Sequence, residues 1–291
     1  MVRRASAHPS PAGDPFRRAG THHCRAPGAA VRSRFGPAVT GLFACAALCL
    51  VLACLLPLPG LSGAALAGPD DDERFRTLRE AMVRDQIEHP RDYRDPVRDR
   101  RVLEAMRTVP RHLFVAPQDI PRAYEDHPLP IGHGQTISQP YIVALMTEML
   151  RVEPGHRVLE VGTGSGYQAA ILSLITDEVY TVEIVEALAL PAAARLKSLG
   201  YGKVRVKTAD GYLGWEEYAP FDRILVTCAA PLVPPPLLRQ LRPGGKMFIP
   251  LGAQYAVQVL TLVEKAEDGS VSMRKTLPVR FVPFVLPAGK E

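Results

Sequence analysis

The hydrophobic positions after residue 156 alternate between two spacings. Short runs rich in β-branched residues are typical of buried strands, and apolar positions between them recur at helical spacing. The strand candidates are residues 158–161, 179–182, 204–207, 223–227 and 246–250, and the helix candidates lie around 167–175, 187–199 and 236–241. Because strands that alternate with helices form parallel sheets, this pattern predicts a doubly wound α/β domain with a mostly parallel sheet.

Other patterns flank this alternation. Residues 257–263 and 270–277 surround an Asp-Gly pair and predict a C-terminal antiparallel hairpin. Upstream, helical spacing over 72–88 and 96–109 predicts an N-terminal helical preface. Residues 121–139 are rich in Pro and Gly and predict an irregular loop, followed by a helix over 140–150.

The first 67 residues differ from the rest of the chain. Residues 1–37 are rich in Pro, Gly, Ala and Arg and predict a disordered leader. Residues 38–56 carry no charge and, as a helix, would span about 28 Å, close to the thickness of a bilayer core. With arginines before it and Ala65-Leu66-Ala67 after it, the 38–67 segment resembles an export signal peptide; an uncleaved membrane anchor is the alternative.

Charge and cysteine follow the same division. The net charge is +5, but seven arginines and only one acid lie in residues 1–67, so the remaining chain holds 28 basic and 29 acidic side chains. This near-neutral body argues against a nucleic-acid partner. The body also contains a single cysteine, Cys228, which excludes an internal disulfide and a Cys-based zinc site there, and no metal site is expected.

A glycine-rich loop follows the first strand candidate. It reads Glu160-Val161-Gly162-Thr163-Gly164-Ser165-Gly166 and opens a predicted helix, where glycines allow a ligand to approach backbone N–H groups. The spacing differs from the G-x-G-x-x-G loop of dinucleotide folds, and the acid before it would repel a pyrophosphate.

Two further acids end the next strands. Glu183 ends the second strand candidate, and Asp210-Gly211 follows the third. Open α/β sheets bind ligands at the carboxyl ends of their strands, so these acids are expected to surround one crevice. The alternative is that each acid caps the helix that follows it.

These motifs resemble known families. An acid followed by G-x-G-x-G resembles the S-adenosylmethionine loop of class I methyltransferases. The segment 122–141 resembles the substrate-binding segment of the protein-L-isoaspartate O-methyltransferases, most specifically in Thr136-Ile137-Ser138-Gln139-Pro140. The resemblance extends from about residue 78 to 286 and includes 109–115, 221–227, 241–252 and 280–285. Departures are His133, where many relatives have Gln, and Cys228.

The resemblance implies a fold, a reaction and site residues. The fold is a class I methyltransferase, with residues 68–150 as preface and substrate-binding segment and 151–291 as the S-adenosylmethionine-binding core. The reaction is methylation of the α-carboxylate of L-isoaspartyl residues in damaged proteins and peptides, by a monomer. The implied residues are Ser138 for catalysis, Thr136, Ser138 and His133 for substrate, and Glu160, Gly162, Thr163, Gly164, Gly166, Glu183, Asp210 and Gly211 for the cofactor.

Several of these residues have a second interpretation. Ser138, ahead of a proline and an apolar run, also fits a helix N-cap. Asp126 and His127 are adjacent, so their side chains point apart and predict loop residues rather than an acid–base pair. Cys228 fits a buried apolar filler.

Two other functions and two locations stay open. A class I methyltransferase acting on another carboxylate or a small molecule would share the glycine loop, and a non-catalytic, membrane-tethered domain would share the fold. The family and its cofactor supply imply the cytoplasm. The 38–56 segment instead implies membrane contact, with the body on the far side of the bilayer.

Overall fold

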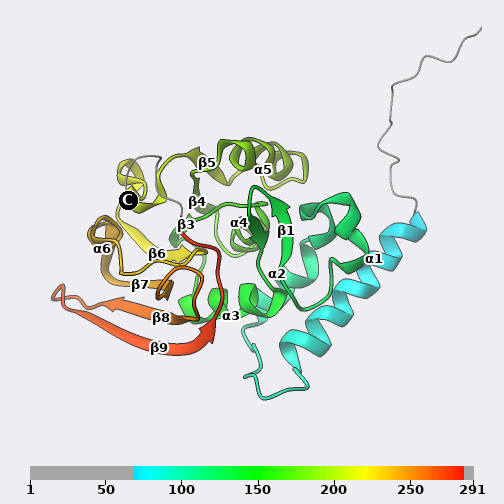
Figure 1. Ribbon diagram of the computed structural model, residues 1–291, viewed down its shortest axis with the longest axis horizontal. Coiled ribbons are helices and arrows are strands. Elements are labelled where there is room, and N and C mark those ends of the chain that lie inside the picture. Colours follow the sequence, from blue (N-terminus) through cyan, green and yellow to red (C-terminus); the bar gives the residue numbers. More distant parts are fainter. Residues whose placement is uncertain (1–68, 285–291) are drawn as a thin grey trace, which may run out of the picture. The chain divides into compact units, whose positions relative to one another are not determined.

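The computed structural model describes residues 69–284 (Figure 1). The predictions for residues 1–37 and 38–67 therefore lie outside the described residues, as do residues 285–291. Among the helices that are described, none combines the length and the apolar character needed to cross a bilayer.

A seven-stranded sheet forms the centre of the fold, in the order β5-β4-β3-β6-β7-β8-β9. The five strands β3, β4, β5, β6 and β7 run parallel to one another. Strand β8 pairs antiparallel with β7 and with β9, which confirms the doubly wound, mostly parallel sheet with its C-terminal hairpin. The strands are β3 (Arg157–Val161), β4 (Glu178–Glu183), β5 (Arg205–Thr208), β6 (Phe221–Val226), β7 (Leu241–Leu251), β8 (Gln258–Lys265) and β9 (Val271–Val279).

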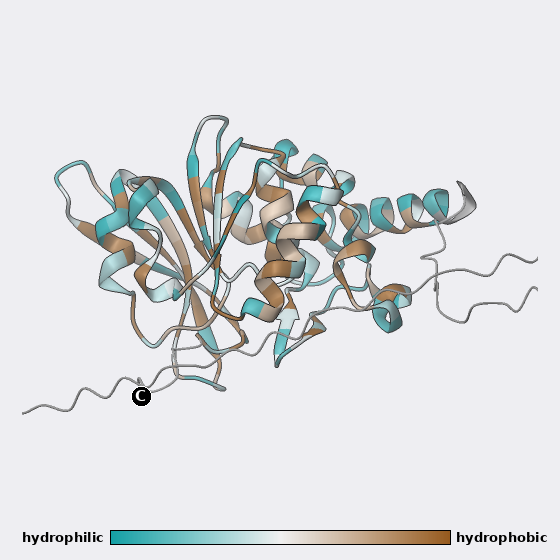
Figure 2. Ribbon diagram, turned by 90° about the horizontal axis from the view of Figure 1, so that it is seen from above, coloured by the Kyte–Doolittle hydropathy of each residue, from teal (hydrophilic) through white to brown (hydrophobic). Residues whose placement is uncertain are grey.

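Helices cover both faces of this sheet, as side-chain alternation along the strands requires. In β3, Val158 packs in the apolar cluster with α3, α4 and the preface, whereas Leu159 and Val161 pack on the other face with α6. Figure 2 shows mostly apolar positions on the strands, while the first helix is largely hydrophilic. The helices are α1 (Pro69–Met82), α2 (Arg100–Thr108), α3 (Pro140–Leu150), α4 (Tyr167–Ser173), α5 (Glu186–Ser198) and α6 (Pro235–Gln240).

The preface differs in detail from its prediction. Helical spacing over 72–88 holds, but α1 ends at Met82 and the chain continues as a π-helical turn, Val83–Glu88. Helix α2 begins after Asp99, whose side chain accepts a hydrogen bond from the Arg101 N–H at 2.9 Å.

The prediction of an irregular loop over 121–139 is wrong for its second half. Strands β1 (Leu129–Gly132) and β2 (Gln135–Ile137) form a small antiparallel hairpin. Leu129 and Ile137 are paired and buried, so they hold the hairpin against the core. The alternation spans only three or four residues and includes Pro130, which is too little signal to distinguish a strand from a loop.

Buried side chains fix the chain just before this hairpin. The Arg111 Nε–H donates to the Ala123 carbonyl at 2.8 Å, and the Tyr124 hydroxyl lies 2.7 Å from His112 Nδ1. Burial lowers the pKa of His112 to about 4, so its ring is neutral above pH 5. These contacts determine where the following residues meet the start of α3.

Candidate active site

The glycine loop joins β3 to α4 in backbone conformations that favour glycine. Gly162, Gly164 and Gly166 have φ angles of 102°, 52° and 89°. A Cβ at Gly162 would lie 2.3 Å from Thr227 Oγ1, so no larger residue fits without movement. Gly162 and Gly164 line two small cavities at the carboxyl end of β3, while their own N–H groups donate to the Val182 carbonyl and the Glu183 carboxylate.

Glu160 is fully buried one residue before the end of β3. Neither of its carboxylate oxygens has a hydrogen-bond partner among residues 69–284, and burial raises its pKa to about 8. It lines a small cavity together with Thr163 and Ser138. A buried carboxylate without a partner is costly, so the site fits a ligand that brings a cationic group, as S-adenosylmethionine does.

Glu183 lies at the end of β4, beside the glycine loop. Its Oε2 accepts the Gly164 N–H at 2.9 Å, and its Oε1 accepts the Val185 N–H at 3.0 Å. Glu183 lines a second small cavity with Gly162, Gly164 and Gly211. The structure thus brings four of the predicted cofactor residues to one crevice.

Three other predicted cofactor residues have different surroundings. Asp210 accepts the Tyr212 N–H at 2.9 Å and caps a short 3₁₀ turn, as the capping alternative expected; it does not line the second cavity. Thr163 lies by Glu160, with its hydroxyl 2.7 Å from that of Thr181. Gly166 packs against Leu196, so its place is structural.

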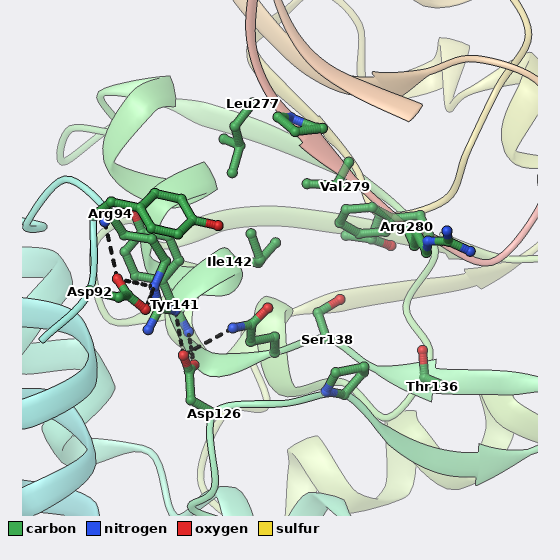
Figure 3. Close-up of a pocket in the computed structure, with 16 residues that line it drawn as sticks. Asp92, Arg94, Asp126, Thr136, Ser138, Tyr141, Ile142, Leu277, Val279 and Arg280 are labelled. Atoms are coloured by element: carbon green, nitrogen blue, oxygen red, sulfur yellow. Dashed lines mark hydrogen bonds and ion pairs between the residues drawn. The ribbon is translucent and has the colours of Figure 1, made fainter. Parts of the chain in front are cut away.

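A larger pocket of about 710 Å³ adjoins both small cavities. Thr136 and Thr227 line all three spaces, and Ser138 lines the pocket and the Glu160 cavity. Figure 3 shows Ser138 and Thr136 at one side of this pocket. These residues mark the junction at which a group bound by the glycine loop can meet a molecule in the pocket.

Ser138 does not cap α3, so that interpretation is wrong. The N-cap position is Gln139, without a side-chain cap hydrogen bond. Asp126 supplies the side-chain acceptor instead, because its Oδ1 accepts the Tyr141 N–H at 3.0 Å in the first turn of the helix. The Ser138 hydroxyl makes no hydrogen bond to another residue in the described part of the chain, which leaves it available to a ligand.

Asp126 also organises the far end of the pocket. Its Oδ2 accepts the Gln139 side-chain N–H at 2.9 Å and is ion-paired with Arg94, whose guanidinium lies 4.4 Å from the centre of the Tyr141 ring. Sequence reasoning missed Arg94 and Thr227, and it took Asp126 for a loop residue without a role in the site. Thr227 ends a recognisable strand next to the loop, but the Asp126 contacts connect segments far apart in sequence.

His133, His127 and Cys228 lie less centrally. His133 is exposed at the tip of the β1–β2 hairpin and lines none of the three spaces. His127 Nε2 lies 2.6 Å from Glu125, so Asp126 and His127 do not pair, as predicted. Cys228 lines the Glu183 cavity, and burial raises the pKa of its thiol, consistent with an inert side chain.

Sequence comparison finds a matching family model and similar proteins. The family model "Protein-L-isoaspartate(D-aspartate) O-methyltransferase" matches residues 82–288. Protein-L-isoaspartate O-methyltransferase 2 of Polaromonas sp. (strain JS666 / ATCC BAA-500) is 63% identical over 189 residues, which cover 65% of this chain and 90% of that protein. Protein-L-isoaspartate O-methyltransferase 2 of Syntrophobacter fumaroxidans (strain DSM 10017 / MPOB) is 54% identical over 234 residues, covering 79% and 94%.

A solved structure agrees with these relatives. The putative protein-L-isoaspartate O-methyltransferase of Plasmodium falciparum, in complex with S-adenosyl-L-homocysteine, matches with a TM-score of 0.60 and 25% identity over 72% of this chain and 98% of that chain. The glycine loop, the buried acid beside it and the extent of these matches lead to one conclusion: this chain belongs to the protein-L-isoaspartate (D-aspartate) O-methyltransferase family.

Proposed function

We propose that this protein repairs damaged proteins by moving a methyl group from S-adenosylmethionine to the α-carboxylate of L-isoaspartyl residues. The methyl ester is a better leaving group than the carboxylate, so it recloses to a succinimide, part of which hydrolyses to normal aspartate. Family membership supports the reaction class, and the Plasmodium falciparum relative binds S-adenosyl-L-homocysteine, the demethylated form of this cofactor.

The nucleophile requires little activation. An α-carboxylate has an ordinary pKa of about 3.5 and is ionised at pH 7, so no general base is needed. The Ser138 hydroxyl donates a hydrogen bond that orients this carboxylate, with Thr136 beside it at the junction of the three spaces. Catalysis then comes from holding the oxygen in line with the methyl group and keeping competing water away.

The proposed roles of the cofactor-binding residues follow from their positions around the crevice. S-adenosylmethionine supplies an electrophilic methyl group on a cationic sulfur. Glu160 provides the negative charge that a cationic ligand needs, and Glu183 offers carboxylate oxygens to ribose hydroxyls. Gly162 and Gly211 line the crevice at positions where a Cβ would collide with Thr227 and Val161. Thr163 and Gly164 line the Glu160 cavity, Gly166 holds the loop against Leu196, and Asp210 is proposed to approach the cofactor from the turn after β5.

One observation carries this proposal more than any other. Ser138 has an available hydroxyl at the opening between the large pocket and the cavity of a buried, unpartnered acid, Glu160. A donor for an anionic substrate therefore lies next to an acceptor for a cationic cofactor. That arrangement suits transfer from a positively charged donor to a carboxylate.

A paired-peptide assay tests the function. The full chain is incubated with S-adenosylmethionine and either an L-isoaspartyl peptide or its twin containing normal aspartate. We expect methyl ester formation on the first peptide and not on the second. Methylation of a small carboxylic acid with no transfer to the isoaspartyl peptide would support the alternative, a class I methyltransferase for another substrate.

We also propose that catalysis takes place in the cytoplasm, where S-adenosylmethionine is made and from which its charges prevent easy passage through a bilayer. The proposed division of labour is that residues 68–150 supply Thr136 and Ser138 on the substrate side, and that residues 151–291 bear the cofactor side and add the β9 wall of the substrate pocket. A monomer suffices, because Ser138 and Glu160 reach the same cavity from one chain.

A further inference from the structure

The large pocket has more room than one isoaspartyl residue needs. Its volume of about 710 Å³ lies in the range of sites that enclose a drug-sized ligand, roughly 300–1,000 Å³. In Figure 3 it extends from Ser138 and Thr136 at one end to Asp92 and Arg94 at the other. A peptide whose isoaspartyl carboxylate lies at Ser138 therefore places a neighbouring side chain toward Asp92.

The far end of the pocket carries an excess negative charge. Among the residues that line the pocket there, Asp92 and Asp126 both pair with a single cation, Arg94, a net charge of −1; Arg91, on the outer side of Asp92, pairs with Asp85. Asp126 is 14% exposed and uses both oxygens, on the Tyr141 N–H, on Gln139 and on Arg94. Asp92 contacts Arg94 alone and is 43% exposed, and the Arg94 contact holds its pKa below the usual range. Asp92 is thus an ionised acceptor with room for a second cation.

The walls between the two ends are apolar. Leu277 and Val279, at the end of β9, face Ile142 of α3 across the pocket, and the Tyr141 ring lies beneath Arg94. Tyr93 is fully exposed next to Asp92. A long side chain with an apolar stem and a cationic head matches such a passage, because the stem contacts apolar walls and the head reaches a carboxylate and an aromatic face.

The charge at the opposite end has the other sign. Arg280 lines the pocket on the side of Ser138 and Thr136, is exposed, and has no ion pair with any residue between 69 and 284. The pocket is therefore positive where the isoaspartyl carboxylate is expected and negative at Asp92. A peptide with a carboxylate followed or preceded by a basic residue is complementary to this arrangement.

We propose that Asp92 and the adjoining apolar walls form a subsite that selects a lysine or arginine next to the isoaspartyl residue of the substrate. This inference rests on the proposed function, since it concerns a peptide held by that same site. Asp92 acts on substrate affinity and not on the transfer step, because it lies at the end of the pocket away from Ser138.

Four isoaspartyl peptides test the subsite. They differ only in a lysine or a glutamate placed directly before or directly after the isoaspartyl residue, and KM and kcat are measured for each at low ionic strength. We expect lysine on one side to lower KM by about three- to fivefold relative to glutamate, the size expected for a partly exposed charge pair, with kcat unchanged. Added salt should reduce the difference.

Variants identify the group responsible. Asp92→Asn keeps the shape of the side chain and leaves Arg94 paired with Asp126, so this variant should lose the lysine preference. Asp92→Glu keeps the negative charge and should show the preference of the native protein. Asp177→Asn is the matched control, because Asp177 is an exposed acid paired with Lys203 and does not line the pocket. The control should keep the full preference.

The outcomes separate the subsite from the function. If none of the four peptides is methylated, the proposed function fails and the subsite with it. If all four are methylated with equal KM, the function stands and the subsite is overturned. A lysine preference that persists unchanged in Asp92→Asn likewise overturns it, whereas loss in Asp92→Asn with recovery in Asp92→Glu supports it.

Discussion

Ser138 is the residue whose role can be tested most directly, because its hydroxyl has no structural task in the described chain. Ser138→Ala removes the proposed donor to the substrate carboxylate, and a hydrogen bond to a charged group contributes about 1.5–3 kcal/mol. We expect turnover of an isoaspartyl peptide to fall by about tenfold or more, with the affinity for S-adenosyl-L-homocysteine and the melting temperature nearly unchanged.

Two further variants check this expectation. Ser138→Gly should be as inactive as Ser138→Ala, since both lack the hydroxyl, and Ser272→Ala, at an exposed position of β9, should keep full activity. An active Ser138→Gly enzyme together with an early-melting Ser138→Ala enzyme would instead indicate a role in starting α3, contrary to the geometry.

Ionisation of a single side chain, Glu160, should make both stability and cofactor affinity depend on pH. Its pKa is about 8 in the folded, ligand-free protein and about 4.5 in an unfolded chain. Between these values the folded state holds more protons, so the stabilisation associated with protonated Glu160 is complete below about pH 4.5 and is lost as the pH rises through about 8. A cationic ligand prefers the ionised carboxylate, so cofactor affinity should rise with pH, by up to about tenfold per unit, and level off above about 8.

Calorimetry measures this coupling. Titration of S-adenosylmethionine into the protein from pH 6 to 9, in buffers of different ionisation enthalpy, reports both the affinity and the protons released on binding. Glu160→Gln cannot ionise, so its affinity should be weaker and should lack the component that rises toward pH 8. Identical pH profiles for the two proteins would show that Glu160 does not contact the cationic part of the ligand.

At the level of residues, what the sequence revealed depended on whether regular elements carry the residues. Glu160 lies near the end of the first predicted strand and Glu183 ends the second, and parallel strands bring their carboxyl ends together, so their proximity was predictable. Asp126 was not, because its partners Arg94 and Tyr141 are 32 and 15 residues away and no local pattern encodes those contacts.

Among the elements, those of the strand–helix alternation were predictable, including the four-residue β5, whereas the β1–β2 hairpin was not. Helix α3 has the predicted bounds, and the core strands differ from prediction by a few residues at their ends, with β7 beginning earlier, at Leu241. The β1–β2 hairpin was missed because its stability comes from Leu129 and Ile137 packing on the core, not from a local repeat. Yet this hairpin carries Thr136 to the site, so the element hardest to predict is among those closest to the proposed chemistry.

Asp126 lies just before the β1–β2 hairpin and bonds to the start of helix α3, so its removal should lower both stability and activity. Asp126→Ala removes the acceptor for the Tyr141 N–H and a partner of Arg94, and loss of a helix cap alone costs about 1 kcal/mol. We expect a lower melting temperature and, because Ser138 lies directly before α3, a lower turnover.

Asp99→Ala is the matched control for this element. Asp99 caps α2 through the Arg101 N–H and does not line the pocket, so its loss should lower the melting temperature by a similar amount without a comparable fall in turnover. If the two variants lose turnover equally once both are fully folded at the assay temperature, Asp126 has no particular role in placing Ser138.

For the molecule as a whole, residues 1–67 lie outside the α/β pattern of the sequence, which predicts that they are dispensable for cofactor binding. A chain that starts at Gly68 should remain folded, and S-adenosyl-L-homocysteine at about one hundred times its Kd should stabilise it by about 2.7 kcal/mol. Glu183→Ala should weaken that stabilisation in thermal denaturation. A shortened chain stabilised by NAD and not by S-adenosyl-L-homocysteine would contradict the cofactor assignment.

The location of the whole protein sets two physical arguments against each other. Seven arginines precede the apolar residues 38–56 and four acids follow soon after, so the positive-inside rule predicts export of the body. The supply of S-adenosylmethionine predicts the opposite. Translation from Met82 would remove the conflict, but it would also delete Phe75, which is buried and stacked on His112.

We therefore expect the native protein to retain residues before Met82, with isoaspartyl methyltransferase activity in the cytoplasmic or membrane-bound fraction. Fractionation with N-terminal sequencing decides: a mature chain that begins at Gly68 outside the cytoplasm would overturn the proposed location, and an intact, soluble N-terminus would overturn the targeting role of residues 38–56.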